Sequence, residues 1–176
     1  MTISTGARLP SSTFKTMTDK GIVDVTTDSL LKGKKVALFG LPGAYTPVCS
    51  ASHLPGYVEN AAKLRAAGFT DIACVSVNDP FVMAAWGKEH GATGKVTMLC
   101  DVDGSFTRAI GLVADLAQHG LPGSSVVTNI LYPVYKRKMP NKYNIQLNRS
   151  TNATPTVINI TLNTIAIKMP MSNTRP

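Results

Sequence analysis

The residues best suited to chemistry lie in the stretch PGAYTPVC, which runs from Pro42 to Cys49. Thr46 is a favourable N-cap residue and Pro47 is favoured at the first helical position, so the spacing places Cys49 in the first turn of a helix. Free backbone N–H groups and the positive end of the helix dipole stabilise a thiolate at such a place. The stretch therefore predicts a reactive cysteine.

Neighbours of Cys49 complete the predicted site. The Thr46 hydroxyl is close enough in sequence to cap the helical turn and to donate to the sulfur or to a bound oxygen. Pro42 and Gly43 are expected to close the loop over the sulfur and limit the access of water. A cysteine held in this way suits covalent catalysis, but a free cysteine is also often just a small buried apolar side chain. The helix-cap argument alone leaves both interpretations open.

The other cysteines and the histidines form no recognisable ligand set. The chain has three cysteines, an odd number, without disulfide or zinc-ligand spacing. No metal site and no cofactor is indicated. The N-terminal stretch lacks an apolar secretory segment and no apolar run could span a bilayer, so we expect a protein of the cytoplasm that does not bind membranes.

The elements that must position Cys49 alternate between strand and helix. Apolar runs predict buried strands, and capping residues and glycines delimit the helices. Pro55 is expected to interrupt the helix that begins near Thr46, and Gly68 to end it. The predicted strands cover residues 34–40, 71–77 and 95–101, and the predicted helices cover residues 46–68, 78–91 and 106–113. This order indicates an α/β domain with parallel strands covered by helices.

The composition changes near residue 121. Residues 1–120 hold 11 Lys and Arg and all 10 Asp and Glu, a net charge of +1, whereas residues 121–176 hold 7 basic residues and no acidic one, a net charge of +7. Such a break marks a domain boundary, a low-complexity segment or a change in how the sequence arose, for example a shifted reading frame. We expect residues 122–176 to form an atypical basic tail, partly disordered, and nucleic-acid binding by it is the less favoured interpretation.

Several stretches in order and spacing resemble the peroxiredoxins, most closely the type-5 (type II) subgroup and its bacterial relatives. They are GKKVALFGLPGAYTPVCSASHLPGYVENAAKLRAAG, IACVSVNDPFVMAAWGKEHGA, GKVTML, DVDGSFTRAIGL and ADLAQHGL, and the resemblance covers residues 10–121. It implies a thioredoxin-like fold over residues 1–121 and a thiol peroxidase that reduces hydrogen peroxide and alkyl hydroperoxides.

The resemblance also implies roles for single residues. Cys49 matches the peroxidatic cysteine, Thr46 the threonine that hydrogen-bonds the peroxide, and Pro42 the proline that shields the sulfur. Cys74 and Cys100 are expected to be structural, and His53 is expected to be structural rather than part of a Cys–His pair. No resolving cysteine is found, so an external thiol such as glutathione, glutaredoxin or thioredoxin is the expected reductant. The family is compatible with a homodimer.

The chain departs from the family after Leu121. The subgroup continues with an R-S-x-R-Y/F stretch, whose arginine stabilises the thiolate and the displaced oxygen. Here no arginine lies between Arg108 and Arg137. The alternative function is therefore a catalytically impaired peroxiredoxin that acts as an interaction or redox-sensing protein.

The strand, acidic hairpin, strand and final helix with which the family usually continues are also not found after Leu121, and this leads to an expectation about the core. Without them, apolar side chains of the early strands should be partly uncovered, unless the segment 156–167 docks as a replacement strand with Ile158, Ile160 and Leu162 facing inward. The side chains expected to be uncovered are Val36, Leu38, Ile72, Cys74 and Val96.

Overall fold

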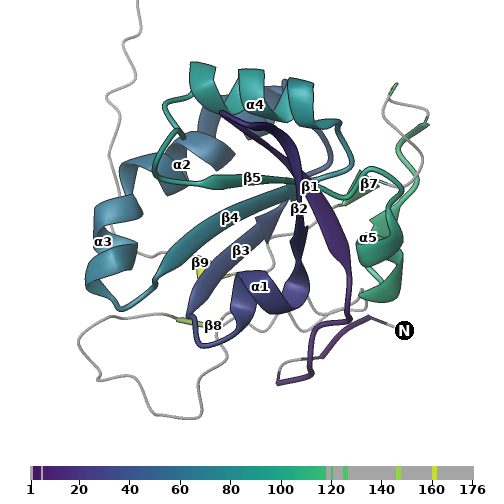
Figure 1. Ribbon diagram of the computed structural model, residues 1–176, viewed down its shortest axis with the longest axis horizontal. Helices are drawn as coiled ribbons and strands as arrows, with labels where there is room; N and C mark the ends of the chain where they lie inside the picture. The colour runs from purple at the N-terminus through teal and green to yellow at the C-terminus, as the bar shows by residue number, and fades with distance from the viewer. Residues whose placement is uncertain are drawn as a thin grey trace, which may run out of the picture.

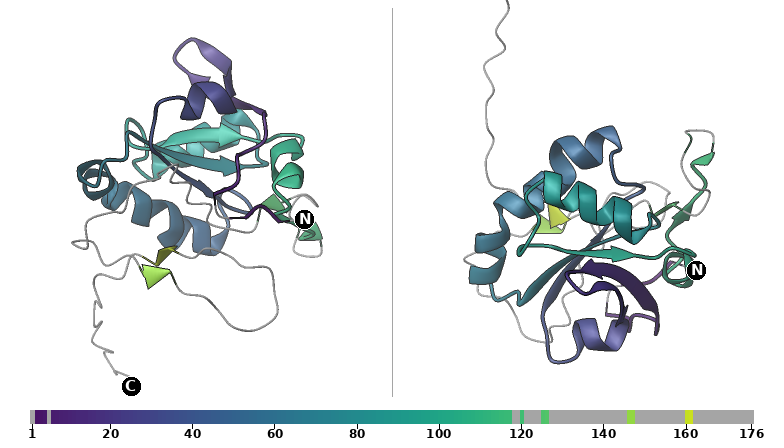
Figure 2. Two further views of the ribbon diagram at one scale, coloured as in Figure 1. Left: turned by 90° about the horizontal axis from the view of Figure 1, so that it is seen from below. Right: turned by 45° about the horizontal axis from the view of Figure 1, so that its top comes forward.

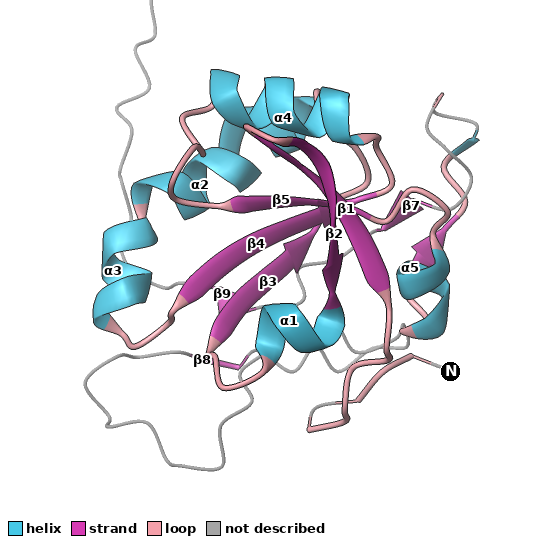
Figure 3. Ribbon diagram, in the orientation of Figure 1, coloured by secondary structure: helices cyan, strands magenta, loops and turns pink. Residues whose placement is uncertain are grey.

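The computed structural model describes residues 2–4, 6–117, 120, 125–126, 146–147 and 160–161. Its centre is a five-stranded mixed sheet in the order β2-β1-β5-β4-β3 (Figures 1 and 3). No helix of the described residues is long and apolar enough to cross a membrane. The mixed sheet and its helices confirm the predicted α/β architecture.

Three parallel strands form the part of the sheet that was predicted from the apolar runs. They are β3 (Val36–Gly40), β4 (Asp71–Ser76) and β5 (Thr97–Cys100), and β4 lies between the other two. All five residues of β3 are buried, as expected for a strand whose sequence is an uninterrupted apolar run. The carboxyl ends of these strands meet at one edge of the sheet, from which the helices depart.

An N-terminal hairpin, which the sequence analysis missed, completes the sheet. Strands β1 (Thr13–Thr18) and β2 (Gly21–Thr26) pair antiparallel, and β1 also pairs antiparallel with β5. A short helix, α1 (Thr27–Leu31), follows with Thr26 as its side-chain cap. The hairpin was hard to predict because its strands mix polar and apolar residues without a continuous apolar run, and because β1 pairs with β5 about 80 residues later in the chain.

The helix after β4 follows its local signals closely. In α4 (Pro80–Glu89), the Asp79 carboxylate accepts hydrogen bonds from the N–H groups of Phe81 and Val82, at 2.9 and 3.0 Å. Pro80 occupies the first turn, where its missing N–H costs nothing. The short helix α5 (Ser105–Ala109) follows β5, also as predicted.

The helix that carries Cys49 does not stop at Pro55, so the predicted interruption there is wrong. A π-helical turn, η1 (Cys49–His53), runs directly into α2 (Leu54–Glu59), and the Leu54 N–H bonds to the Cys49 carbonyl five residues earlier. The wider turn accommodates the proline, because Pro55 cannot donate to the carbonyl four residues back and its ring would clash there in a regular α-helix. The break comes instead at Asn60, before α3 (Ala61–Ala66).

Two apolar clusters lie on opposite faces of the sheet. One cluster joins β3–β5 to η1 and to α2, α3 and α4, and the other joins the same strands to β1, α1 and α5. Figure 2 shows α1 on the side of the sheet away from α2 and α3. Successive residues of a strand pack in opposite clusters: Leu38 faces α1, and Phe39 faces α2.

The expected exposure of core side chains is also wrong. Val36, Leu38, Ile72 and Cys74 are at most 1% exposed and Val96 is 6% exposed. Leu9, Phe14 and Leu30 from the N-terminal segment pack in the cluster that holds Val36 and Leu38. For Val36 and Leu38 the expectation failed because it left the hairpin and α1 out of the covering elements. Ile72, Cys74 and Val96 are covered in the other cluster by residues of α2, α3 and α4.

Little of the C-terminal third belongs to the described residues. Strand β6 (Val113–Ala114) pairs with β7 (Ser125–Val126), and β8 (Gln146–Leu147) pairs with β9 (Ile160–Thr161), all antiparallel. The rest of the predicted basic tail, including Ile158 and Leu162, lies outside the described residues, and the prediction of a partly disordered segment stays a prediction.

Candidate active site

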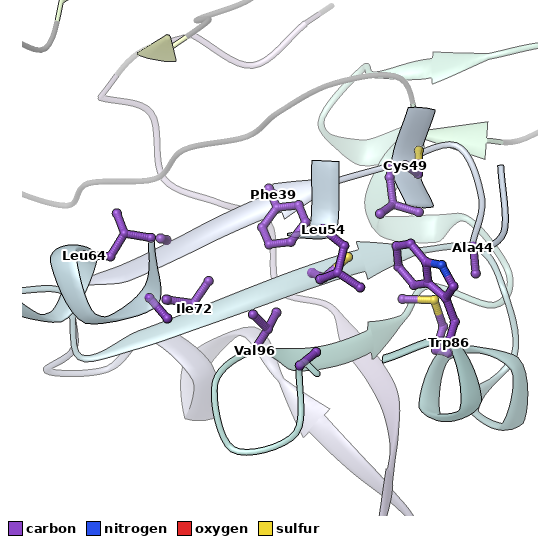
Figure 4. Close-up of a cluster of buried hydrophobic side chains, with 14 of the residues drawn as sticks. Phe39, Ala44, Cys49, Leu54, Leu64, Ile72, Trp86 and Val96 are labelled. Carbon is purple, nitrogen blue, oxygen red and sulfur yellow. The ribbon is translucent and has the colours of Figure 1, made fainter. Parts of the chain in front are cut away.

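Cys49 is the first residue of η1 and lies at one end of the apolar cluster that joins β3–β5 to η1, α2, α3 and α4. Its side chain is free and only 4% exposed. Figure 4 shows it next to Trp86, Ala44 and Leu54, at the opposite end of the cluster from Leu64. The sulfur is therefore on a strand–helix junction, as the sequence predicted, in surroundings that largely exclude water.

The helix of Cys49 begins at Thr46. The Ser50 N–H donates to the Thr46 carbonyl at 3.0 Å, which makes Thr46 the backbone N-cap, as predicted. The N–H groups of Val48 and Cys49 therefore lie in the first turn without a helical acceptor, and Pro47 has no N–H. Within the described part of the chain, no side chain caps this end. These two N–H groups provide a positive local field beside the sulfur.

The Thr46 hydroxyl points back along the loop, which differs from the expected side-chain cap. It donates to the Gly43 carbonyl at 2.9 Å. Tyr45, between them, has a φ of 62°, and it is the only described residue other than glycine with a positive φ. This left-handed turn brings the carbonyl to the hydroxyl and leaves the hydroxyl oxygen's lone pairs free to accept a hydrogen bond.

Neighbouring elements hold the loop and the helix start. The Trp86 indole N–H, from α4, donates to the Ser50 hydroxyl at 3.0 Å. Pro42 is half-buried in the same loop and Gly43 is buried. Shielding of the sulfur by Pro42 stays a prediction, whereas the contribution of Trp86 was not foreseen, because a tryptophan on a helix usually serves only as core.

His53 has aromatic neighbours. Its ring centroid lies 5.2 Å from that of Phe39 and 5.9 Å from that of Tyr57, and the rings of Phe39 and Tyr57 stack at 3.8 Å. These contacts hold η1 and α2 against β3. They agree with the structural role that was expected for His53.

The other two thiols are buried within the sheet. Burial raises the pKa of Cys74 well above its ordinary value, and the neighbouring Cys49 and Cys100 add to this effect. Burial, followed by the charge of Asp79, raises the pKa of Cys100 to about 12. Both thiols therefore stay protonated at neutral pH and are poor nucleophiles. The expectation that they are structural agrees with this burial.

Two of the three described arginines, Arg65 and Arg108, have other partners. Arg65 donates to the Gly94 carbonyl at 3.4 Å, and Arg108 donates to the Asp103 carbonyl at 2.6 Å. Arg137 lies outside the described residues. Among the described residues, no group of three or more His, Cys, Asp and Glu side chains could hold a metal ion.

Comparison with known proteins places these features in a family. The family model described as Redoxin matches residues 4–130. Peroxiredoxin-2D of Arabidopsis thaliana is 42% identical over 120 residues, which cover 68% of this chain and 74% of that protein. The chloroplastic peroxiredoxin-2E of the same plant is 47% identical over 116 residues, which cover 65% of this chain and 50% of that protein. This chain thus spans about half the length of the latter relative.

A solved structure matches over most of the described fold. The crystal structure of reduced Prx3 from Vibrio vulnificus in complex with H2O2 has a TM-score of 0.65 and 41% sequence identity, and the match covers 78% of this chain and 92% of that one. This match confirms the thioredoxin-like fold expected from the sequence.

Proposed function

The chain belongs to the peroxiredoxins within the redoxin family, and from this premise we propose that it is a thiol-dependent peroxidase that reduces hydrogen peroxide and small alkyl hydroperoxides through Cys49. The observation that supports this most directly is the geometry of the helix start. A free, nearly buried thiol lies in the first turn of a helix, where the N–H groups of Val48 and Cys49 have no helical acceptor.

The proposed reaction is a two-electron oxidation of the sulfur. The Cys49 thiolate attacks the terminal oxygen of the hydroperoxide, an S–O bond forms, and the O–O bond breaks. The departing oxygen takes the electron pair and a proton and leaves as water or an alcohol, while Cys49 becomes a sulfenic acid. The first-turn N–H groups stabilise the negative charge that moves across the site. The Thr46 hydroxyl, within the same turn, is proposed to contact the bound peroxide.

The sulfenic acid must then be reduced by thiols from outside the chain. One thiol displaces water and forms a mixed disulfide with Cys49, and a second thiol attacks that disulfide and releases the Cys49 thiol. Cys74 and Cys100 are poorly suited to replace the external thiol, since burial keeps both protonated. Glutathione, glutaredoxin or thioredoxin are the proposed reductants, and the cytoplasm and a homodimeric state are proposed with them.

Turnover with substoichiometric protein tests the proposal. Purified chain at a small fraction of the peroxide concentration is mixed with excess glutathione or dithiothreitol, and peroxide is followed over time. The proposed function requires many peroxide molecules consumed per chain. Consumption that stops at one peroxide per chain would instead support the impaired, redox-sensing alternative, and no oxidation of Cys49 at all would contradict both.

A further inference from the structure

We propose that Asn78 is a positioning residue for the peroxide reaction, holding one peptide group of the 42–46 loop so that the Thr46 hydroxyl and Cys49 keep their relative placement. Asn78 lies between β4 and α4, some 30 residues after Cys49, and it contributes no group to the reaction itself. The inference rests on the proposed function for its catalytic consequence but not for its structural part.

The contacts of the Asn78 side chain are specific. Its Oδ1 accepts a hydrogen bond from the backbone N–H of Ala44 at 2.8 Å. The same oxygen accepts a second bond, from the hydroxyl of Ser76, at 2.7 Å, and Ser76 is fully buried. The Ala44 N–H can only donate, so it fixes which end of the amide faces the loop, and the Ser76 hydroxyl, which donates to the same oxygen, helps to hold the amide in place. Asn78 therefore joins the rigid end of β4 to the loop before Cys49.

The bond to Ala44 acts on Thr46 through a single peptide group. The N–H of Ala44 and the carbonyl of Gly43 belong to the same planar unit, in which the two groups point in opposite directions. Asn78 holds the N–H end of this unit, and the Thr46 hydroxyl donates to its carbonyl end at 2.9 Å. Rotation of this peptide plane would move the acceptor of the Thr46 hydroxyl, so Asn78 sets the direction of that hydroxyl.

The loop needs such a restraint because its backbone is strained at the next residue. Tyr45 has a φ of 62°, a conformation that a bulky side chain adopts only where surrounding contacts impose it. The pKa of the exposed Tyr45 is raised by desolvation and then by the Glu89 side chain, at the last residue of α4. Asn78 lies just before α4 and Glu89 at its end, so the two ends of this helix act on the loop at Ala44 and Tyr45, directly before Thr46.

Two variants separate positioning from folding. Asn78→Ala removes the acceptor, and Asn78→Asp keeps an oxygen at the same place. Asn60→Ala is the matched control: its amide donates to the Gly56 carbonyl at 2.8 Å, between α2 and α3 and away from the loop. Ser76→Ala is a milder variant that leaves Asn78 in place but removes the bond that orients it, and it replaces Asn78→Ala if that variant does not fold.

The first readout is amide hydrogen exchange at Ala44, measured by NMR, which needs no peroxide. We expect Asn78→Ala to abolish the protection of this N–H, and Asn78→Asp and Asn60→Ala to retain it. Undiminished protection in Asn78→Ala would overturn the proposal. This readout judges the Asn78 contact even if the parent chain proves unreactive toward peroxide, an outcome that would overturn the proposed function instead.

The second readout compares two reactions of Cys49. We expect the rate constant for oxidation by hydrogen peroxide to fall about ten- to hundredfold in Asn78→Ala, since misplacing a reacting group by about 1 Å has effects of this size. Alkylation by iodoacetamide, which needs no aligned Thr46, should be unchanged or faster. Asn78→Asp should recover the peroxide rate to within about tenfold of the parent. Equal losses in both reactions, or an unaltered peroxide rate, would overturn the positioning role.

Discussion

Two helices of this fold begin in a similar way, each after a parallel strand and each with a capping residue followed by proline. Thr46 and Pro47 follow β3, and Asp79 and Pro80 follow β4. In α4 the Asp79 carboxylate accepts from two N–H groups of the first turn. At the Cys49 junction the Thr46 hydroxyl turns away to Gly43, and the first-turn N–H groups receive no side-chain cap among the described residues.

The difference shows that the same sequence pattern, a capping residue followed by proline, can stabilise a helix, as at α4, or leave N–H groups available for chemistry, as at Cys49. A carboxylate cap satisfies the N–H groups and neutralises the helix dipole, which stabilises α4 but leaves nothing to hold an anion. A neutral threonine that bonds elsewhere leaves the first-turn N–H groups without a side-chain acceptor. The Asp79 carboxylate also adds to the effect of burial in raising the pKa of Cys100.

The largest expected effect concerns the sulfur at the uncapped junction. Cys49→Ser should abolish peroxide consumption, because a serine hydroxyl is a far weaker nucleophile and forms no sulfenic acid. Cys74→Ser and Cys100→Ser, as matched controls, should keep most of the activity, measured as peroxide consumed with excess thiol. Activity that survives in Cys49→Ser would show that the uncapped helix start is not the reacting site.

Thr46→Asp would convert the uncapped junction into a copy of the capped one. The new carboxylate should accept from the first-turn N–H groups and repel the thiolate, so the rate of peroxide oxidation should fall about a hundredfold or more. The free energy of unfolding should remain within about 1 kcal/mol of the parent, since aspartate is a good cap.

Thr46→Val removes the hydroxyl without adding a charge, so it separates the two effects of Thr46→Asp. It should lower the peroxide rate by less than Thr46→Asp, yet by more than a change of about 1 kcal/mol in stability can explain. Stopped-flow oxidation and urea unfolding of the two variants give both quantities. If Thr46→Asp reacted with peroxide as fast as the parent, the lack of a carboxylate cap at the Cys49 helix would have no role in the reaction.

Asp79→Ala tests the capped junction. Loss of the carboxylate should lower the free energy of unfolding by about 1 kcal/mol, because the N–H groups of Phe81 and Val82 lose their acceptor. The rate of Cys49 oxidation in the folded protein should change less than about threefold, since Asp79 holds α4 rather than the Cys49 turn. A fall in the rate of Cys49 oxidation greater than the lost free energy of unfolding can explain would mean that both helix starts take part in the reaction.

The smallest expected effect is a pH dependence of stability through Cys100. Its pKa of about 12 in the folded chain lies above the ordinary value of 9.0. The folded state therefore retains this proton when the unfolded chain has lost it, so the contribution of the thiol to stability is complete below pH 9 and declines as pH rises toward 12. Between pH 8 and 9.5 the decline should be less than about 1 kcal/mol.

Cys100→Ala should reduce this pH dependence by the contribution of Cys100 and leave that of the buried Cys74 thiol, whose pKa is also raised by burial. Urea unfolding at the two pH values measures the difference. Asp79→Asn keeps a good cap but removes the charge, so it should weaken the dependence only in part. An identical loss of stability between pH 8 and 9.5 in Cys100→Ala and the parent would contradict the assigned pKa.

The sequence alone determined those features that depend on residues within about one helical turn of each other. Apolar runs gave β3, β4 and β5, Asp79 and Pro80 gave the start of α4, and Thr46 with Pro47 placed Cys49 in a first turn. These signals are local because helix capping and strand burial involve neighbouring residues. The resemblance carried by the same stretches supplied the family and the interpretation of Cys49.

The tertiary structure decided which groups meet across the fold. It pairs the N-terminal hairpin with β5, covers Val36 and Leu38 from that side, and brings Asn78 to Ala44 across 34 positions of sequence. It also turns the Thr46 hydroxyl toward Gly43, since a left-handed Tyr45 is a bend that its own residue type disfavours and that only outside contacts can impose. Local spacing carries no information about such partners, because each depends on where a distant strand or helix packs.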